Sequence, residues 1–296
     1  MDLCLNMSNN RLWHRLKNTT LDTLYKESLR HWELDACPLE NYSVSRIYFG
    51  TEFCQRLLPS PEVIRNRYEI VKQHRVPFTF LTPYVTDDGI SRVRKSLDSL
   101  SMLTDGEENG VEVVVNDWGV LSLIRRDYSG LTPVLGRILS KITKDPRIDF
   151  QNHEQFRHSL NVYQKTNITI AAVRHLLRRF GVERVEIDMP DQRLQMDADG
   201  LGIELSIHLG LNYVMTGRIC MLGSLNASAG EKFKPARECQ KECQKYRAFA
   251  ENPLLRGRVY HQGNTVFFAT PWHSDLVEYV QSLGVSRIIF APDIPV

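Results

Sequence analysis

The sequence predicts an α/β protein with a TIM-like barrel of the (β/α)8 type, and two observations carry this prediction. Short apolar segments alternate along the chain with amphipathic ones, giving about eight strand–helix units. The chain has 296 residues, a length that α/β barrels commonly use for one domain. A doubly wound sheet would share this local pattern, but no glycine-rich phosphate-binding fingerprint follows the first strand. We therefore expect one barrel domain over residues 1–296.

Apolar segments bounded by turn residues predict the strands of the first half. They cover residues 2–7, 46–50, 77–82 and 111–115. The last of them, VEVVV, is a nearly continuous β-branched run of the kind found in strands buried on both faces. Helices are expected between the strands, over residues 21–32, from Pro61 onward, and over residues 87–100. Proline favours the first position of a helix because its missing N–H would be unpaired there anyway.

The same alternation continues in the second half of the chain. Strands are expected over residues 132–136, 159–163, 184–189, 203–208 and 287–293. Residues 168–180 and 275–283 predict helices, each followed by a glycine suited to the left-handed position after a helix. Residues 258–270 predict a hairpin that turns at Gly263 and Asn264. The basic segment 136–149 lengthens the chain after the fifth strand, so we expect an irregular barrel.

Composition and charge exclude several classes of protein. Hydrophobic residues make up 42% of the chain and charged residues 24%, as in ordinary globular domains. The net charge is only +2, which argues against a protein that coats nucleic acid. No apolar run approaches the ~20 residues of a membrane span, and the N-terminal segment lacks the layout of a signal peptide. We therefore expect a cytoplasmic protein whose thiols stay reduced.

Three clustered cysteines are the main chemical signal in the sequence. Cys220, Cys239 and Cys243 follow the pattern C-x18-C-x3-C within a polar segment rich in Lys and Glu. Free cysteines are usually small buried hydrophobes, so cysteines in such a segment are unusual. In a reduced compartment the pattern favours metal or redox chemistry. It predicts a metal or iron–sulfur site that lacks one ligand, within a cysteine-rich insertion at about 217–257.

Barrel geometry nominates the fourth ligand. Functional side chains of a barrel lie at the carboxyl ends of its strands. Cys54 directly follows a predicted strand, whereas Cys4 lies within the first strand and Cys37 lies on the opposite face of the barrel. The predicted ligands are therefore Cys54, Cys220, Cys239 and Cys243, in a loop region at the C-terminal face. The alternative is a set of unrelated free thiols.

Four thiolates hold either a structural zinc ion or an iron–sulfur cluster. Zinc sites usually pair two short C-x2-4-C motifs, and this sequence has one C-x3-C motif. One ligand from a distant strand end suits a cluster that docks over the barrel mouth. The sequence therefore favours a cluster over zinc.

Other polar residues at predicted strand ends are weaker candidates for a catalytic role. Arg137 could bind a carboxylate or phosphate, or form a surface ion pair. His208 could carry protons or be a hydrogen-bonded neighbour of the core. Asn161 and Arg218 could line the pocket, and Arg218 could offset the charge of a cluster.

Three further polar residues at strand ends, Asn116, Asp117 and Asp188, have structural alternatives. Asp188 could orient a ligand or cap the turn that follows it. Asn116 and Asp117 could cap the helix that starts near Trp118.

Several cysteine-containing segments resemble a known family. The segment IYFGTEFCQR is similar to the first cysteine motif of the collagenase-like peptidase family (peptidase family U 32). Residues 159–246 resemble the core of that family through SLNVY, VERVEIDMP, GRICMLGS and CQKECQKY. The resemblance covers most of the chain from about Arg46. In length the chain is most similar to the paired proteins of oxygen-independent ubiquinone hydroxylation, and that likeness implies a [4Fe–4S] cluster on Cys54, Cys220, Cys239 and Cys243.

The resemblance implies a function in oxygen-independent hydroxylation, either of a ubiquinone-type ring or of an RNA base. A small aromatic or quinone-like substrate, or RNA, would then be the partner molecule. The alternative is a non-catalytic, cluster-bearing subunit in a heterodimer with a homologous barrel. Peptidase activity is the weakest expectation, because neither H-E-x-x-H nor G-x-S-x-G occurs in the sequence.

Overall fold

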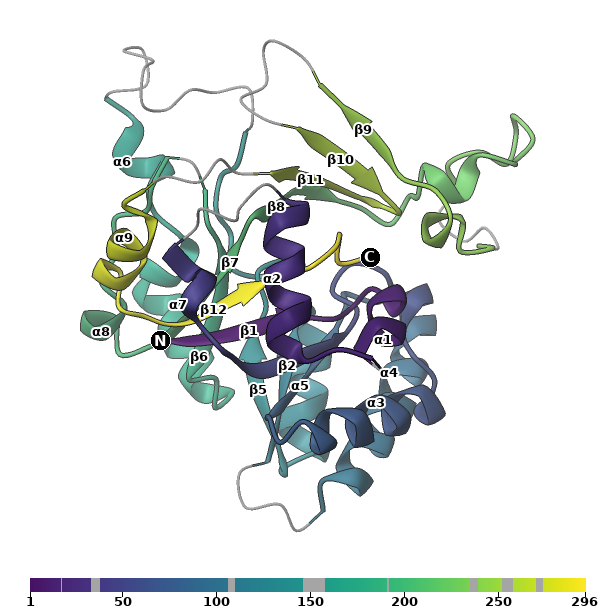
Figure 1. The fold of residues 1–296 in the computed structure, drawn as a ribbon, viewed down its shortest axis with the longest axis horizontal. Helices are drawn as coiled ribbons and strands as arrows, with labels where there is room; N and C mark the ends of the chain where they lie inside the picture. Colours follow the sequence, from purple (N-terminus) through teal and green to yellow (C-terminus); the bar gives the residue numbers. More distant parts are fainter. Residues whose placement is uncertain are drawn as a thin grey trace.

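A computed structural model describes the chain except for residues 17, 33–37, 106–109, 146–157, 191, 235–238, 252–257 and 270–273. Its centre is a closed barrel of parallel strands in the order β1-β12-β7-β6-β5-β4-β3-β2, with helices packed around it (Figure 1). The strands are β1 (Asp2–Asn6), β2 (Val44–Gly50), β3 (Phe78–Thr82), β4 (Val111–Val115), β5 (Leu131–Leu135), β6 (Arg184–Asp188), β7 (Glu204–Leu209) and β12 (Val285–Phe290). This confirms the predicted TIM-like barrel.

Helices follow most of the barrel strands, and their starts obey simple capping rules. The longer ones are α2 (Leu21–His31), α3 (Pro61–Gln73), α4 (Asp87–Leu103), α5 (Trp118–Asp127) and α7 (Ala171–Arg179); α1 (Asn10–Leu16), α8 (Ala198–Leu201) and α9 (Leu276–Ser282) are shorter. The side chains of Thr20 and Ser60 accept hydrogen bonds from the first turns of α2 and α3. Asp117 caps α5 in the same way, so the helix-capping role that the sequence offered for it is the one observed.

The barrel strands are buried on both faces, as the apolar runs indicated. Along β4, Val111, Val113 and Val115 face the helices and belong to the main apolar core. Val114 instead faces the barrel interior. There it packs in a small separate cluster with Cys4, Tyr48, Leu81, Val134 and Ile289. Alternation of side chains along each strand thus separates two environments, and the interior one also contains polar side chains.

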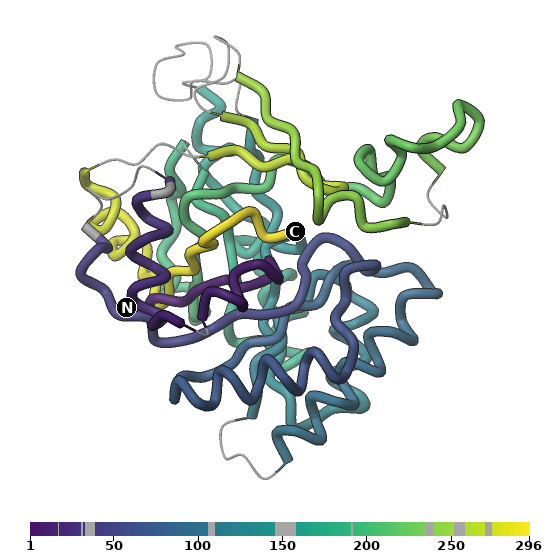
Figure 2. The backbone as a smooth tube through the Cα atoms, turned by 45° about the vertical axis from the view of Figure 1, so that its right-hand side comes forward, coloured from purple at the N-terminus to yellow at the C-terminus, as the bar shows by residue number. Residues whose placement is uncertain are grey.

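A second sheet stands beside the barrel and carries most of the cysteine-rich region (Figures 1 and 2). It is antiparallel, in the order β8-β11-β10-β9. Its strands are β8 (Leu211–Thr216), β9 (Ala248–Ala250), β10 (Val259–Gln262) and β11 (Thr265–Ala269). The C-terminus lies next to this sheet, and Ile294 and Val296 join its apolar cluster with Phe53, Tyr213 and Phe267. We call the sheet with residues 217–247 the cysteine lobe, of which residues 235–238 lie outside the described part.

Some sequence expectations need correction here. Residues 159–163 were expected to be a strand, but α6 (Leu160–Tyr163) is a helical turn. Its alternating apolar residues misled the prediction because a short apolar segment does not distinguish helix from strand. Strand β8 was not predicted, since it follows β7 after a single residue, Gly210, which has φ +88°. The hairpin turning at Gly263 and Asn264 is confirmed.

A charged layer closes the barrel interior near the N-terminal ends of the strands. The Glu112 carboxylate accepts hydrogen bonds from Arg287 at 2.6 and 3.1 Å and lies 3.3 Å from Arg46 Nη1. Arg184 Nε lies 3.7 Å from the same carboxylate. Burial would raise the pKa of Glu112, but the hydrogen bonds and charges of the arginines outweigh it and lower that pKa.

Replacing the central carboxylate should destabilise the barrel. Glu112→Gln leaves three arginines without their shared anion, and we expect a loss of about 3 kcal/mol in the free energy of unfolding at pH 7. Because the pKa of Glu112 is lowered by folding, its contribution is present above its unfolded pKa and disappears as the pH falls through its folded pKa. The difference from wild type should therefore narrow below about pH 4 in urea unfolding experiments. The exposed Glu69→Gln on α3 is the control, and an equal loss in both variants would contradict the assignment.

Candidate metal centre

The four predicted cysteine ligands come from three parts of the chain. Cys54 follows β2 and precedes a short 3-10 turn over Gln55–Leu57. Cys220 follows β8, and Cys243 lies in a second 3-10 turn, Glu242–Gln244. Cys239 stands four residues before Cys243. All four side chains line one cavity of about 90 Å³ between the barrel and the cysteine lobe.

The remaining cysteines do not reach this cavity. Cys4 is buried in the barrel interior, as its place within β1 predicted. Cys37 lies outside the described residues. The juxtaposition of the other four is therefore selective among the cysteines that the structure describes.

The four sulfur atoms surround the cavity without forming a tight group. In the described part of the chain, no three of them lie within 4.8 Å of one another. A tetrahedral zinc ion with Zn–S bonds of about 2.3 Å would hold its sulfur ligands roughly 3.8 Å apart. The arrangement is thus wider than a closed zinc site.

Backbone and side-chain groups around the cavity favour negative charge on sulfur. The N–H of Gly223 donates to Cys220 Sγ at 3.2 Å, and the N–H of Lys241 donates to Cys239 Sγ at 3.3 Å. The charged residues that line the cavity are Arg56, Arg218 and Lys234. The buried Glu242 carboxylate lies beside it and opposes them, with its Oε2 3.9 Å from Cys239 Sγ.

Burial nevertheless keeps three of the thiols protonated in the free protein. It raises the pKa of Cys54 and of Cys220, and that of Cys243 to about 12. The neighbouring cysteines add to the rise for Cys243. A bound metal would reverse this balance, because a coordinating thiol is deprotonated outright.

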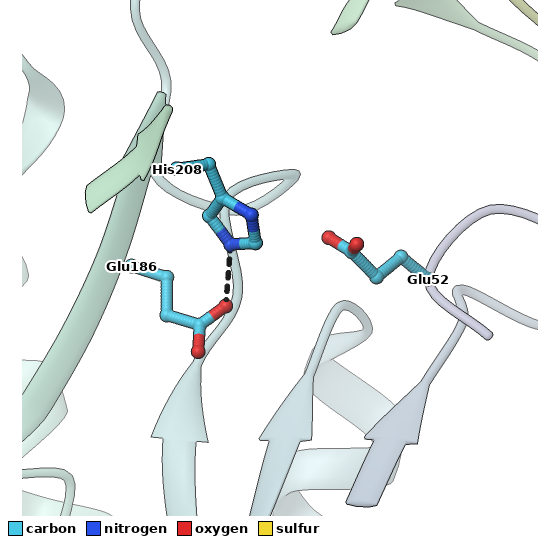
Figure 3. A group of neighbouring side chains, drawn as sticks. All are labelled: Glu52, Glu186 and His208. Atoms are coloured by element: carbon cyan, nitrogen blue, oxygen red, sulfur yellow. Dashed lines mark hydrogen bonds and ion pairs between the residues drawn. The ribbon is translucent and has the colours of Figure 1, made fainter. Parts of the chain in front are cut away.

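A second polar group lies inside the barrel (Figure 3). His208 on β7 is 2% exposed, and its Nε2 lies 2.9 Å from Glu186 Oε2 on β6. Figure 3 shows the His208 ring between the carboxyl groups of Glu186 and Glu52. Burial raises the pKa of Glu186 to about 8, helped by the nearby charge of Glu52, and it lowers the pKa of His208 well below its ordinary value. A protonated Glu186 therefore donates to a neutral His208.

Arg137 is the hub of a third group at the barrel mouth. Its guanidinium donates to both oxygens of Glu52 at 2.8 and 3.0 Å and to Asp188 Oδ1 at 2.8 Å. Lys144 also pairs with Asp188, and its ammonium lies 3.4 Å from the centroid of the Tyr213 ring. Both carboxylates are fully buried and paired. The charges of this group are thus balanced within the protein.

Of the four weaker candidates, only Asn161 lies away from the position expected, but Arg137 and His208 are bound within the protein. Arg137 is neither at the surface nor free to bind a substrate, because its donors are used within the protein. His208 is a hydrogen-bonded neighbour of the core, which was the alternative to a proton carrier. Asn161 lies in α6, exposed, and not at a strand end. Arg218 does line the cavity, with Nη2 3.4 Å from the carbonyl of Val85.

Sequence reasoning missed Glu52, Glu186 and Lys144 as site residues. Glu186 had a usable signal, since VEID alternates apolar and acidic residues on a strand expected to be buried on both faces. Glu52 and Lys144 lie in connecting segments, where no periodicity reports which way a side chain points.

Comparisons with known proteins assign the chain to no family. No family model matches the chain, and neither does any curated protein. A family 18 glycoside hydrolase N-acetylglucosaminidase from Paenibacillus barengoltzii is 10% identical, with 98% of this chain and 94% of that chain covered and a TM-score of 0.35. A class V chitinase from Nicotiana tobaccum is also 10% identical, with 99% and 94% covered and a TM-score of 0.35. A Group IV chitinase from Ostrinia furnacalis has 10% identity, coverage of 98% and 92%, and a TM-score of 0.30.

These findings correct the function predicted from the sequence. The chain was expected to act as an iron–sulfur hydroxylase of the collagenase-like peptidase family, or as a partner subunit or peptidase of that family. The solved structures that resemble it are instead family 18 glycoside hydrolases and chitinases, so that prediction is wrong. At this identity and TM-score the likeness concerns the barrel fold alone.

In the described part of the chain, no helix is both long and apolar enough to cross a membrane. The cytoplasmic location expected from the sequence stays a prediction.

The buried Glu186 carboxyl should make the free energy of unfolding depend on pH. Its pKa is higher in the folded protein than in the unfolded chain, so it stabilises the fold fully below its unfolded pKa, and this contribution is lost as the pH rises toward about 8. Glu186→Gln keeps a donor toward His208 but cannot ionise. Relative to wild type, the variant should gain up to about 1.4 kcal/mol per pH unit in unfolding free energy between pH 5.5 and 7.5.

Urea unfolding of both proteins at several pH values checks this expectation. The exposed Glu183→Gln, just before the same strand, should track wild type throughout. A constant difference between Glu186→Gln and wild type over this range would show that Glu186 is already ionised.

Proposed function

We propose that Cys54, Cys220, Cys239 and Cys243 bind a metal centre between the barrel mouth and the cysteine lobe. The observation that carries the proposal is the shared cavity: four thiols from three distant segments line the same space of about 90 Å³. Buried free cysteines ordinarily pack against apolar neighbours and leave no space between them. Thiols arranged around a cavity, with N–H donors aimed at two of the sulfurs, are better suited to binding than to packing.

We infer the kind of metal from the thiol ligands and not from membership of an enzyme family. The sequence predicted a [4Fe–4S] cluster with zinc as the alternative, and both use thiolate ligands. The cavity measures about 90 Å³, and in the described part of the chain no three of its sulfurs lie within 4.8 Å of one another, which is wider than a single zinc ion requires. An iron–sulfur cluster would supply electron transfer or structural support.

The cations of the cavity suit an anionic centre. Four thiolates carry four negative charges, and Arg56, Arg218 and Lys234 line the same space. Hydrogen bonds from Gly223 and Lys241 would further stabilise two of the sulfurs. Hydrogen bonds to sulfur and nearby positive charge are the means by which proteins set the potential of a cluster.

Metal analysis of protein purified without oxygen tests the proposal. We expect one centre per chain, reported by iron and acid-labile sulfide, or by zinc if the alternative holds. Changing any one of Cys54, Cys220, Cys239 or Cys243 to Ser should lower metal retention by more than about tenfold, because a direct ligand is worth at least as much as an outer-shell contact. Cys4→Ala is the matched control, since Cys4 is buried away from the cavity.

Two results would contradict the proposal. One is wild-type protein that takes up neither iron with sulfide nor zinc during reconstitution. The other is retention in the four Ser variants equal to that of Cys4→Ala.

Of the partners predicted from the sequence, only a protein partner has an observation in its favour. Large apolar side chains are exposed along the cysteine lobe, and contiguous exposed apolar surface is typical of interaction sites. They are Met215, Ile219, Met221, Leu225, Phe233, Tyr246 and Phe249. A heterodimer with a homologous barrel would cover such side chains, and size-exclusion chromatography of the co-expressed pair tests it. Neither the small aromatic or quinone-like substrate nor RNA has a specific contact in support.

A further inference from the structure

The turn between β10 and β11 contacts three of the cysteine-bearing segments. It consists of Gly263 and Asn264, which line the cavity of the cysteines, and it follows Gln262, the last residue of β10. Gly263 has φ +66°, as the first central residue of a two-residue hairpin turn often does. A Cβ atom there would lie 3.0 Å from Val296 Cγ1 and 3.5 Å from Cys243 Cβ. The turn is therefore packed directly against one cysteine.

Asn264 links the segments of Cys54 and Cys220. Its side-chain amide donates to the carbonyl of Phe53, next to Cys54, at 2.7 Å. The same amide donates to the carbonyl of Gly217, shortly before Cys220, at 2.6 Å. Tyr84 closes this network, since its hydroxyl donates to the carbonyl of Gly217 at 2.7 Å and lies 3.0 Å from the Asn264 amide nitrogen.

Gln262 binds the segment of Cys243 to the hairpin in a similar way. Its side-chain amide donates to the carbonyl of Cys243 itself at 2.9 Å, and to the carbonyl of Val296 at 3.4 Å. Gln262 is 4% exposed, so water cannot replace these hydrogen bonds easily. Apolar contact adds to them, because the Phe53 and Phe267 rings meet edge to face at 5.2 Å. Cys54, Cys220 and Cys243 are thus connected through one turn.

We infer that Gln262 and Asn264 are positioning residues that set the separation of three of the four thiols. This inference rests on the proposed metal centre and deepens it. The two side chains touch backbone carbonyls, not the sulfurs, and so they act by fixing where each cysteine-bearing segment lies. Outer-shell groups that orient metal ligands typically contribute 10–100-fold in metal affinity. The turn thus belongs to the centre although it supplies no ligand.

Replacing the NH2 donor of each side chain by a carboxylate oxygen, which can only accept, tests the inference. Asn264→Asp and Gln262→Glu keep the shape of the side chain but place acceptors against carbonyl oxygens. We expect the loaded variants to lose metal to a chelator roughly 10–100-fold faster than wild type. Asn226→Asp, exposed in the cysteine lobe, and Gln281→Glu, exposed on α9, make the same chemical changes away from the cavity and should match wild type.

A second measurement on metal-free protein separates the two proposals. A short bifunctional thiol reagent should cross-link Cys54 to Cys243 in wild type and in the controls, and much more slowly in the turn variants. If wild type binds no metal but cross-linking still depends on the turn, the metal centre fails and the positioning role stands. If metal loss and cross-linking are both unchanged in the turn variants, the positioning role is overturned. If circular dichroism shows that either charged variant does not fold, Asn264→Ala and Gln262→Ala replace them. The same two measurements, the rate of metal loss and the rate of cross-linking, then decide.

Discussion

One buried guanidinium, that of Arg137, connects the barrel to everything built on its mouth. It pairs with Glu52, two residues before Cys54, and with Asp188 at the end of β6. It also donates to the carbonyl of Leu211, where β8 begins. A buried charge is tolerable only when its partners satisfy it fully, so the three segments must meet for the arginine to be buried at all. The position of the cysteine cavity follows from that requirement, because Cys54 is carried by the segment that Glu52 anchors.

Polar side chains occupy both ends of the barrel interior, which an ordinary barrel fills with branched apolar residues. Glu112 and its arginines form one layer near the N-terminal strand ends, and the Arg137 group forms another at the mouth. His208 and Glu186 lie between them, next to a thin apolar layer that includes Tyr48 and Val114. Such layers contribute little net stability, but each misplaced strand would leave a charge unpaired. The polar interior thereby helps to specify the strand register.

The fold was predictable from the sequence because short apolar-rich segments alternate along the chain with amphipathic ones, in the order that a barrel requires. Spacing and the rule that barrel loops gather at one face were enough to predict that these four cysteines lie near one another, as they do around one cavity. Other features had no such signal. The four-residue segment of α6 was too short for periodicity to separate helix from strand. The burial of Arg137 depends on Glu52 and Asp188, which lie 85 and 51 residues away, and no local pattern reports a pairing of that kind.

The cysteine lobe has an apolar cluster of its own, distinct from the main core between the barrel and its helices. Its contributors include Phe53 from a barrel loop and Val296 from the C-terminus, while Tyr213 and Phe267 come from the second sheet. Separate cores of unequal size open at different free energies, and the smaller one opens first. We therefore expect the lobe to open at a lower free energy than the barrel. Such opening would give the proposed metal a route to enter or leave after folding, without disturbing the barrel.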